Sequence, residues 1–408
     1  MESKSLKSNM LWNSVGSLYY STCQWLITVL VARLSSGFDA AGILSIAMSV
    51  SNIFSQIGLY RIRSYQVSDI HEEYSSREYV GFRLETIAVG FLITIVYALI
   101  SCSPEMLVPI LLYLLFRAGD TFVDVLHGVD QQHFRMDYCG KSMLIRATLF
   151  LVSFTIGLAF FNSLNVAISG MVLSTYLAII YDITKTRGLS DIRPSITLEK
   201  SKRLLLTCLP AVIGMSLCSV VVTYARQYLG EACGSSALGI YATVCTPIVI
   251  IQACANYVYA PLLGIFAESY DTGRTSDFIS LLMKTLFALV VIFAVCAVGF
   301  VLVGDQLLGF IFGPTIAANG NLIYAGLLCS MLTALVAFLS DLLISLRDMN
   351  GCFIGNLIGC LVSFPATHIL VSQFGMNGTS YSISISYIVV SIILIFRLVR
   401  LVKPKAIA

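Results

Sequence analysis

Residues 106–124 read MLVPILLYLLFRAGDTFVD, and this stretch decides the fold. It begins as an apolar run and then carries Arg117, Asp120 and Asp124. A charge at the centre of a bilayer costs about 2.5–3.5 kcal/mol on insertion scales, so such side chains face protein or water rather than lipid. The stretch therefore predicts a membrane-spanning helix with one polar face turned into the protein.

The polar face of this predicted helix continues to residue 131. At about 100° per residue, the side chains of Tyr113, Arg117, Asp120, Asp124 and Gln131 fall on one side of the helix. Charged residues inside a membrane often mark a transport pathway. A purely structural ion pair between Arg117 and one of the two aspartates is the alternative, and the sequence leaves both interpretations open.

The composition of the whole chain agrees with a membrane protein. Of its 408 residues, 57% are hydrophobic and 12% are charged, whereas soluble domains contain roughly 45–50% apolar and about 25% charged residues. So few charges cannot cover a water-facing surface of this size. The formal net charge of +3 is too small to indicate a nucleic-acid partner. The chain is predicted to be a polytopic, all-α membrane protein.

Stretches without Asp, Glu, Lys or Arg predict the other helices, because a crossing needs about 20 apolar residues. Two stretches are long enough for a helical hairpin and contain a break, at 162–165 and at 375–378. We expect the short apolar piece 307–312 to lie in the membrane interface. Together with 106–127, these stretches give twelve helices; they are 8–32, 40–60, 86–104, 147–181, 204–225, 232–267, 285–304, 306–340 and 349–396.

The positive charges predict the orientation of these helices. If the connections alternate between the two sides, 22 of the 25 Lys and Arg residues fall on the side of the N-terminus, Arg83 and Arg146 among them. Because cytoplasmic connections carry the excess of Lys and Arg, we expect both termini in the cytoplasm.

Two six-helix halves are predicted from the longest basic connection, around 182–203, with an N-terminal bundle at 1–190 and a C-terminal bundle at 191–408. Similar pieces recur at related offsets: Ala32-Arg33 matches Ala225-Arg226, and Asn52/Gln56 matches Gln252/Asn256. Six helices return the chain to its starting side, so such halves would be parallel repeats. We expect them to enclose a central cavity.

Polar stripes on several predicted helices favour a hydrated cavity. For any single residue, a hydrogen bond between helices is the alternative. Stripes on corresponding helices of both halves favour the cavity. The candidate lining residues are Asn13, Tyr20, Gln24, Asn52, Gln56, Gln252 and Asn256.

The chain resembles the Wzx-type oligosaccharide flippases, which form the polysaccharide transport family of the multidrug/oligosaccharidyl-lipid/polysaccharide (MOP) exporter superfamily. The resemblance covers the full length. It is strongest in WNSVGS (12–17), WLITVLVARL (25–34) and AGI (41–43), and it continues in FR (116–117) and VDVLHG (123–128). In the second half it is carried by PL (261–262), Tyr270 and IFG (311–313).

This resemblance implies a substrate and a location. The substrate would be an undecaprenyl-diphosphate-linked oligosaccharide repeat unit. It would move from the cytoplasmic to the outer leaflet of the bacterial cytoplasmic (inner) membrane by alternating access, for the synthesis of O-antigen, capsule or another surface polysaccharide. The candidates for contact with the diphosphate are Arg117 within the membrane, Arg61 or Arg63 at the inner mouth, and Arg226 or Arg33 at the outer mouth.

Family members are thought to use an ion gradient, which implies H+ or Na+ as a further partner. Asp120 and Asp124 are the candidates for ion coupling, with Asp341 in reserve. An ion-coupled multidrug/cation antiporter and a lipid II flippase of the same superfamily are the alternatives.

We expect neither an enzyme nor a cofactor. The predicted outer connections are short and nearly free of charge, unlike the long catalytic outer loop of glycan polymerases. The sequence GKS at 140–142 lacks the first glycine of a P-loop, where Arg135 stands, so no nucleotide is expected. His127 and His133 flank Asp130, and we expect no metal site there.

Overall fold

The computed structural model describes residues 6–34, 39–312 and 314–402, and in these ranges the chain forms helices and no strand. Eleven helices or helical segments are long and apolar enough to cross a membrane. A twelfth helix, α1 (Leu6–Leu34), has 29 residues and is also long enough to cross. The protein is therefore an all-α, multi-pass membrane protein.

The contacts within the chain divide it into two compact units, which we call the N-unit (Met1–Cys208) and the C-unit (Leu209–Ala408). The division falls within α8, so this helix begins in one unit and ends in the other. The predicted boundary between residues 190 and 191, the central cavity and the cytoplasmic location of both termini stay predictions.

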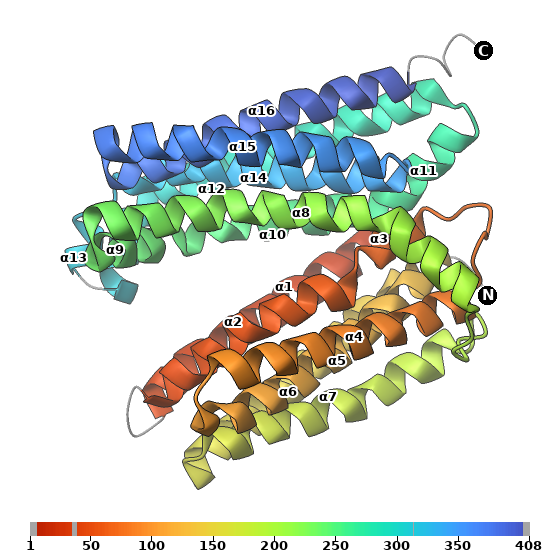
Figure 1. Cartoon of the computed structure of the whole chain (residues 1–408), viewed down its shortest axis with the longest axis horizontal. Helices are drawn as coiled ribbons and strands as arrows, with labels where there is room; N and C mark the ends of the chain where they lie inside the picture. Colours follow the sequence, from red (N-terminus) through yellow and green to blue (C-terminus); the bar gives the residue numbers. More distant parts are fainter. Residues whose placement is uncertain (1–5, 35–38, 313, 403–408) are drawn as a thin grey trace. The chain divides into compact units, whose positions relative to one another are not determined.

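In the part of the chain that the structure describes, the N-unit contains seven whole helices that pack side by side, and the start of α8 (Figure 1). Their ends follow from local chemistry: Ser75 and Glu78 form a capping box at α4, and Pro104 occupies the first turn of α5. The helices are α1 (Leu6–Leu34), α2 (Asp39–Leu59), α3 (Ile62–Val67), α4 (Ser76–Ser101), α5 (Pro104–Gln132), α6 (Met136–Phe161) and α7 (Leu164–Thr186).

The C-unit contains a crossing that is interrupted twice, at Pro247 and Pro261. Proline lacks the N–H that continues an α-helix, so the chain tightens into a 3₁₀ turn at each position. The elements are α8 (Leu198–Cys233), α9 (Ser235–Cys245), η1 (Pro247–Val249), α10 (Ile250–Tyr259), η2 (Ala260–Leu262), α11 (Leu263–Asp271), α12 (Thr275–Phe312), α13 (Pro314–Ala317), α14 (Leu322–Ser345), α15 (Met349–Phe374) and α16 (Met376–Val402).

Both predicted hairpin breaks are confirmed. Asn162 ends α6 in the left-handed conformation, with φ of 44°, and the Ser163 hydroxyl accepts a hydrogen bond from the Val166 N–H at the start of α7. Gly375 separates α15 from α16 with φ of 56°. Asparagine and glycine tolerate this backbone region better than other residues.

Two details of the prediction are wrong. Arg83 and Arg146 do not lie in connections: they are inside α4 and α6, with side chains 0% and 6% exposed. Several helices, among them α4, α6, α8 and α12, begin earlier than predicted, because a search for charge-free stretches removes helix ends that carry ionisable residues. The piece 307–312 is the end of α12, and its location in the membrane interface stays a prediction.

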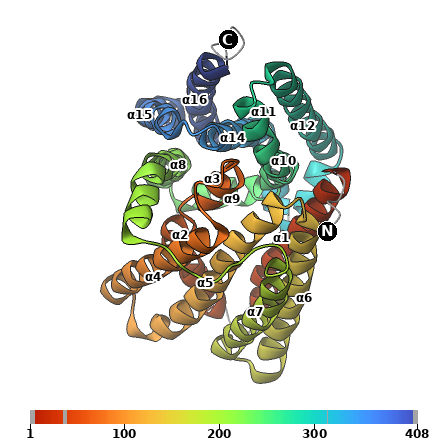
Figure 2. The ribbon, with the colours of Figure 1, turned by 90° about the vertical axis from the view of Figure 1, so that its right-hand side faces the viewer.

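The two units repeat one packing pattern, which can be followed in Figures 1 and 2. The second crossing of each unit breaks at an offset of 200 residues, after Leu59 and after Tyr259. Five helix pairs recur: α2–α4, α2–α5, α4–α5, α5–α7 and α6–α7 of the N-unit correspond to α10–α12, α10–α14, α12–α14, α14–α16 and α15–α16 of the C-unit.

A sixth pair also recurs: α1–α6 of the N-unit corresponds to α8–α15 of the C-unit, and each pair approaches closely at a glycine. A Cβ added to Gly16 of α1 would lie 2.6 Å from Gly140 Cα of α6, and one added to Gly214 of α8 would lie 2.9 Å from Phe353 Cα of α15. Small residues let membrane helices approach this closely. The recurrence supports the predicted pair of six-helix repeats.

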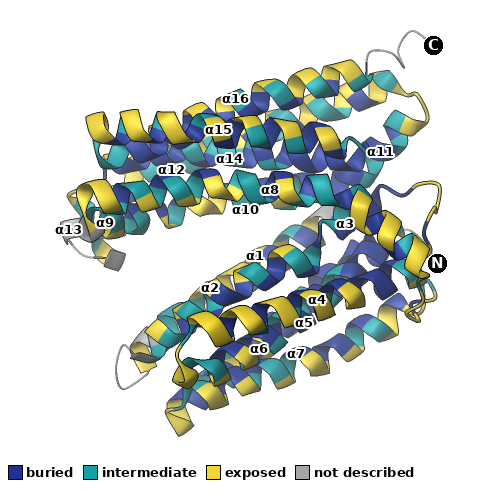
Figure 3. Cartoon of the chain, viewed as in Figure 1, coloured by how far each residue is buried: buried dark blue, intermediate teal, exposed yellow. Residues whose placement is uncertain are grey.

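Exposed residues follow the outer faces of the helices, and buried residues lie on the faces where helices pack together (Figure 3). The most exposed crossing is α12, where only 6% of the residues in its apolar stretch of 18 residues are buried. Because this helix is apolar around most of its circumference, its exposed face suits lipid rather than water.

Candidate functional site

Helix α5 carries the predicted polar face into the interior of the N-unit. It contacts α2, α3, α4, α6 and α7, so side chains from several helices can reach it (Figure 2). Arg117, Asp120, Asp124 and Gln131 all make polar contacts to other helices. The predicted face therefore points into protein.

Asp120 is held by three side chains. The Tyr20 hydroxyl donates to the carboxylate, 2.6 Å from each oxygen, and Arg146 Nη1 lies 2.7 Å from Oδ1. Arg117 Nη1 lies 3.2 Å from Oδ2, and Arg117 Nη2 donates to Ser55 Oγ at 3.1 Å. The Asp120 carboxylate thus joins α1, α5 and α6 and is paired with two guanidinium groups.

Asp124 is held by two arginines from other elements. Arg83 Nη2 lies 2.7 Å from Oδ2, and Arg63 Nη1 lies 3.3 Å from Oδ1. Arg63 also donates to Gln131 Oε1 at 3.2 Å. We call the nine side chains of these two paragraphs the Asp120–Asp124 network: Tyr20, Ser55, Arg63, Arg83, Arg117, Asp120, Asp124, Gln131 and Arg146.

Arg83 explains the break between α2 and α3. Its Nη1 donates to the Gly58 carbonyl at 2.6 Å, and the Thr86 hydroxyl donates to the same oxygen at 2.8 Å. Carbonyls at a helix end have no partner within the helix, and the next residues, Tyr60 and Arg61, take left-handed φ values of 45° and 52°. Arg83 therefore donates hydrogen bonds both to a carbonyl at the end of α2 and to the Asp124 carboxylate.

Arg83 and Arg146 belong to this site, although neither is among the site residues predicted from the sequence. A signal for Arg83 is present: Thr86, Gly90 and Thr94 form a buried face of small residues on α4, and Arg83 lies one turn before Thr86 on that face. No comparable signal distinguishes Arg146, whose partner Asp120 comes from another helix.

A second polar region lies in the C-unit. It is a cavity of about 130 Å³ between α8, α9, η1, α10, α14 and α16, and we call it the Arg226 cavity. A buried water needs only about 10–15 Å³ of such space, so the cavity holds several waters or one polar group. Its lining residues are Val222, Arg226, Tyr241, Cys245, Ile248, Val249, Gln252, Gly326, Cys329, Ser330, Thr333 and Ile383.

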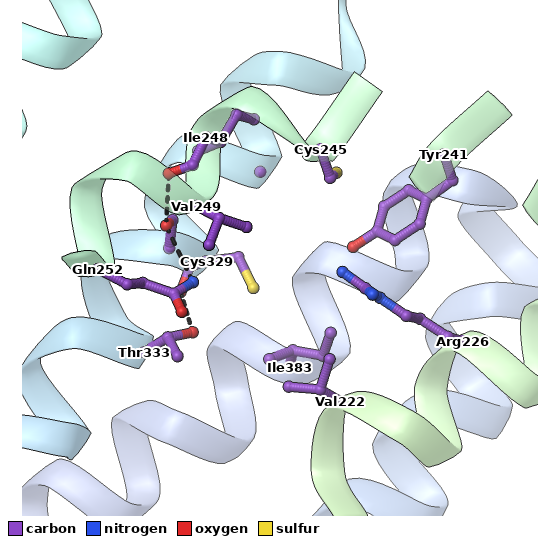
Figure 4. Close-up of a pocket in the computed structure, with 12 residues that line it drawn as sticks. Val222, Arg226, Tyr241, Cys245, Ile248, Val249, Gln252, Cys329, Thr333 and Ile383 are labelled. Atoms are coloured by element: carbon purple, nitrogen blue, oxygen red, sulfur yellow. Dashed lines mark hydrogen bonds between the residues drawn. The ribbon is translucent and has the colours of Figure 1, made fainter. Parts of the chain in front are cut away.

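Arg226 points into this cavity from α8, facing Tyr241 of α9 (Figure 4). On the opposite side, Gln252 Nε2 donates to Ser330 Oγ at 3.1 Å. The Nε atom of Arg226 is buried and has no hydrogen-bond partner. Among the described residues, no carboxylate forms an ion pair with Arg226. The cavity therefore presents an uncompensated positive charge.

A further chain of hydrogen bonds joins two predicted candidates in the C-unit. Asn256 Nδ2 donates to Tyr259 Oη at 2.9 Å, and the Tyr259 hydroxyl donates to Asp341 Oδ2 at 3.0 Å. Tyr259 and Asp341 are buried. This chain connects α10 to α14 and does not include the lining of the Arg226 cavity.

The other predicted residues lie outside both regions. Asn13 is buried in α1, and Gln24 is half-buried there. Asn52 and Gln56 are exposed on α2. Arg33 is exposed at the end of α1, and Arg61 is half-buried at the break after α2.

One curated protein is similar to the chain along nearly its whole length. It is the capsular polysaccharide biosynthesis protein CapF of Staphylococcus aureus, which is 25% identical over 394 residues. The alignment covers 93% of this chain and 96% of CapF. No family model matches the chain.

Solved structures of transporters share the fold. The MATE transporter VcmN of Vibrio cholerae, in its bent form, superimposes with a TM-score of 0.78 at 12% identity, covering 98% of this chain and 97% of VcmN. A MOP-superfamily transporter from Pyrococcus furiosus, described as having a binding pocket of reverse polarity, superimposes with a TM-score of 0.75 at 14% identity. The superposition covers 98% of this chain and 96% of the Pyrococcus furiosus transporter.

These comparisons confirm the resemblance predicted from the sequence. The fold is that of MOP-superfamily transporters, and the curated relative is named for polysaccharide biosynthesis. The chain is thus a multi-pass membrane protein with a transporter fold, and its relatives in both comparisons fit a Wzx-type flippase.

Proposed function

We propose that this chain is a flippase that moves undecaprenyl-diphosphate-linked oligosaccharide repeat units from the cytoplasmic to the outer leaflet of a bacterial cytoplasmic membrane. One observation carries the proposal: the uncompensated Arg226 in a polar cavity of a MOP-type fold. The name of CapF, a capsular polysaccharide biosynthesis protein, supports the choice of a glycan as cargo.

The proposed substrate needs such a cavity. Sugars and a diphosphate cannot cross hydrocarbon unaided, because each polar group without a partner costs several kcal/mol there. Arginine pairs with phosphate through two parallel N–H donors. The charge of Arg226 is costly to keep in a membrane protein without an anion, so binding of a phosphate group would relieve this cost.

The Arg226 cavity would supply further groups to the same ligand. Gln252, Ser330 and Thr333 offer amide and hydroxyl groups that replace water around phosphate or sugar oxygens. At about 130 Å³, the cavity fits the charged head of the substrate rather than the whole oligosaccharide. The polyprenyl tail would stay in the lipid.

The other candidate arginines have a weaker claim on the substrate. Arg117 and Arg63 already pair with Asp120 and Asp124. Arg61 and Arg33 stay candidates for the inner and outer mouths.

Ion coupling is assigned, within this proposal, to the Asp120–Asp124 network, with H+ or Na+ as the driving ion. A conformational change that drew Arg117 away from Asp120 would leave this carboxylate with one ion pair fewer, which favours uptake of a cation. Asp341, which accepts a hydrogen bond from the Tyr259 hydroxyl, stays the reserve candidate for ion coupling. Transport would proceed by alternating access between the two predicted bundles, 1–190 and 191–408.

The transport step can be tested in proteoliposomes containing a fluorescent undecaprenyl-diphosphate oligosaccharide, with transfer measured by a membrane-impermeant quencher. We expect Arg226→Gln to lower the rate tenfold or more, because a hydrogen bond to a charged group is worth about 1.5–3 kcal/mol. Arg274→Gln is the matched control, since Arg274 is exposed at the start of α12 and pairs with Glu268. An unchanged rate in Arg226→Gln would contradict the proposal.

A cation antiporter is the second candidate, because the superimposed structures include MATE transporters. Its substrate would be repelled by Arg226, so Arg226→Gln would leave cation export intact or raise it. Mass spectrometry of lipids that co-purify in mild detergent separates the remaining cases: a polyprenyl-diphosphate glycan supports the flippase, and a lipid II species supports a lipid II flippase.

The coupling step is tested separately with Asp120→Asn and Asp124→Asn, each compared at equal protein level. We expect at least one variant to lose the dependence of transport on the ion gradient. If both keep gradient-driven transport, the network plays no part in coupling.

A further inference from the structure

A cluster of metal-binding side chains lies near the ends of α5, α6 and α7, apart from the Arg226 cavity. His127, Asp130 and Cys139 each place one ligand atom within 4.8 Å of the other two. All three side chains are buried, at 1%, 0% and 0% exposure. The Cys139 thiol lies 3.9 Å from Asp130 Oδ2. The cluster therefore brings nitrogen, oxygen and sulfur donors together in a dry interior.

A second carboxylate faces the cluster from α7. Asp182 Oδ1 lies 3.4 Å from His127 Nε2, and both residues are at least 98% buried. The two atoms face each other without the geometry of a hydrogen bond. A carboxylate beside the ring commonly orients a metal-ligating histidine.

Hydroxyl groups fix the remaining carboxylate oxygens. Ser142 Oγ donates to Asp182 Oδ2 at 2.9 Å, and Thr186 Oγ1 donates to Asp130 Oδ1 at 3.1 Å. Each carboxylate is thus oriented by a hydroxyl on one oxygen and turns its other oxygen toward His127 or Cys139. Partners that orient ligands in this way surround metal sites as a rule.

The charge of the cluster also calls for a cation. Asp130 and Asp182 form no ion pair with Lys or Arg among the described residues. The arginines that act on the cluster across space, Arg63 and Arg146, are bound to Asp124 and Asp120. Two buried carboxylates without a counterion are costly. A divalent cation would neutralise them.

We propose that His127, Asp130 and Cys139 bind a divalent transition-metal ion of the Zn²⁺ class, with Asp182 orienting His127. Histidine, thiolate and carboxylate are the ligands that Zn²⁺ takes in tetrahedral sites, where neighbouring ligand atoms are about 3.3–3.6 Å apart. The 3.9 Å between Cys139 Sγ and Asp130 Oδ2 approaches this spacing. Binding would draw the ligand atoms closer together and release the thiol proton from Cys139.

The site would tie α5, α6 and α7 together a few residues beyond Asp124. Its role is independent of the transported substrate, so failure of the flippase proposal would not affect it. The sequence alone did not indicate it, because His127 and Asp130 come from α5, Cys139 from α6 and Asp182 from α7.

The test measures metal binding directly on the purified full-length chain. Elemental analysis after exposure to Zn²⁺ and dialysis should find one ion per chain, and Co²⁺ should produce the near-ultraviolet charge-transfer band of a thiolate complex. Cys139→Ala should abolish the band, whereas Cys23→Ala, which removes a buried cysteine of α1, should keep it. His127→Gln is a second variant in case Cys139→Ala does not fold.

Two results would overturn the site. One is a folded wild-type protein that retains no Zn²⁺ and shows no Co²⁺–thiolate band, which would mean that protons neutralise the carboxylates. The other is a band that persists in Cys139→Ala or His127→Gln, which would place the metal elsewhere.

Discussion

The Asp120–Asp124 network and the Arg226 cavity both place arginine in a membrane-spanning bundle, but they differ in whether a carboxylate pairs with the guanidinium. In the network, Arg63, Arg83, Arg117 and Arg146 all pair with one of two aspartates. In the cavity, Arg226 has no carboxylate partner among the described residues and borders open space.

The difference separates charges that hold the protein together from a charge that is available to a ligand. Breaking a buried ion pair leaves the partner unsatisfied and destabilises the fold. Removing an isolated charge leaves no partner unsatisfied, so the loss of such a charge should affect binding rather than folding. Each prediction below tests one side of this contrast.

The largest effect is expected for Asp124→Ala. The substitution leaves the Arg83 guanidinium, whose side chain is 0% exposed, without its carboxylate. We expect the free energy of unfolding to fall by about 3–5 kcal/mol, visible as a lower Tm and yield in detergent. Glu268→Gln, which breaks an exposed pair with Arg274, should cost less than about 1 kcal/mol. Equal losses in the two variants would show that the network is not structural.

Substitution of Arg226 by Leu should separate stability from transport. Because no carboxylate loses its counterion when Arg226 is removed, we expect a Tm at or above that of the wild type. Transport of the diphosphate-linked oligosaccharide should fall tenfold or more. A large drop in Tm would mean that Arg226 is structural, like Arg83.

A smaller effect is expected for Tyr20→Phe, which removes the hydroxyl that donates to Asp120. Asp120 keeps Arg117 and Arg146, and the phenyl ring keeps its edge-on contact with Phe150, with ring centroids 5.3 Å apart. Because the hydroxyl bonds a charged group, the expected loss is about 1.5–3 kcal/mol, measured by denaturant unfolding. A loss as large as that of Asp124→Ala would give Tyr20 a role beyond one hydrogen bond.

The smallest effect is expected for Gln252→Leu in the Arg226 cavity. Ser330, the partner of Gln252, still donates to the Ile248 carbonyl at 3.0 Å, so stability should hardly change. Transport should fall about two- to tenfold, the value of one neutral hydrogen bond to the ligand. Unchanged transport would restrict the site to Arg226 itself.

The sequence predicted the helical crossings well because apolar length is a local property. The helix over 106–127 was recognised although Arg117, Asp120 and Asp124 interrupt it, since their spacing keeps them on one face. Breaks at Asn162 and Gly375 were also predictable, because these residue types tolerate the left-handed backbone.

The partners of the buried charges could not be predicted in the same way. Asp120 meets Tyr20 and Arg146 across 100 and 26 residues, and no local pattern records such pairings. Arg83 and Arg146 were assigned to connections because a count of charges treats each arginine as water-facing. A carboxylate on a neighbouring helix removes that requirement.

The central claim is that Arg226 provides the binding charge for a diphosphate. The most direct measurement is the Tm of the purified protein with undecaprenyl diphosphate and with undecaprenol, which share the same tail. The diphosphate should raise the Tm of the wild type more than the alcohol does, and this difference should disappear in Arg226→Gln. An equal difference in Arg226→Gln would contradict it.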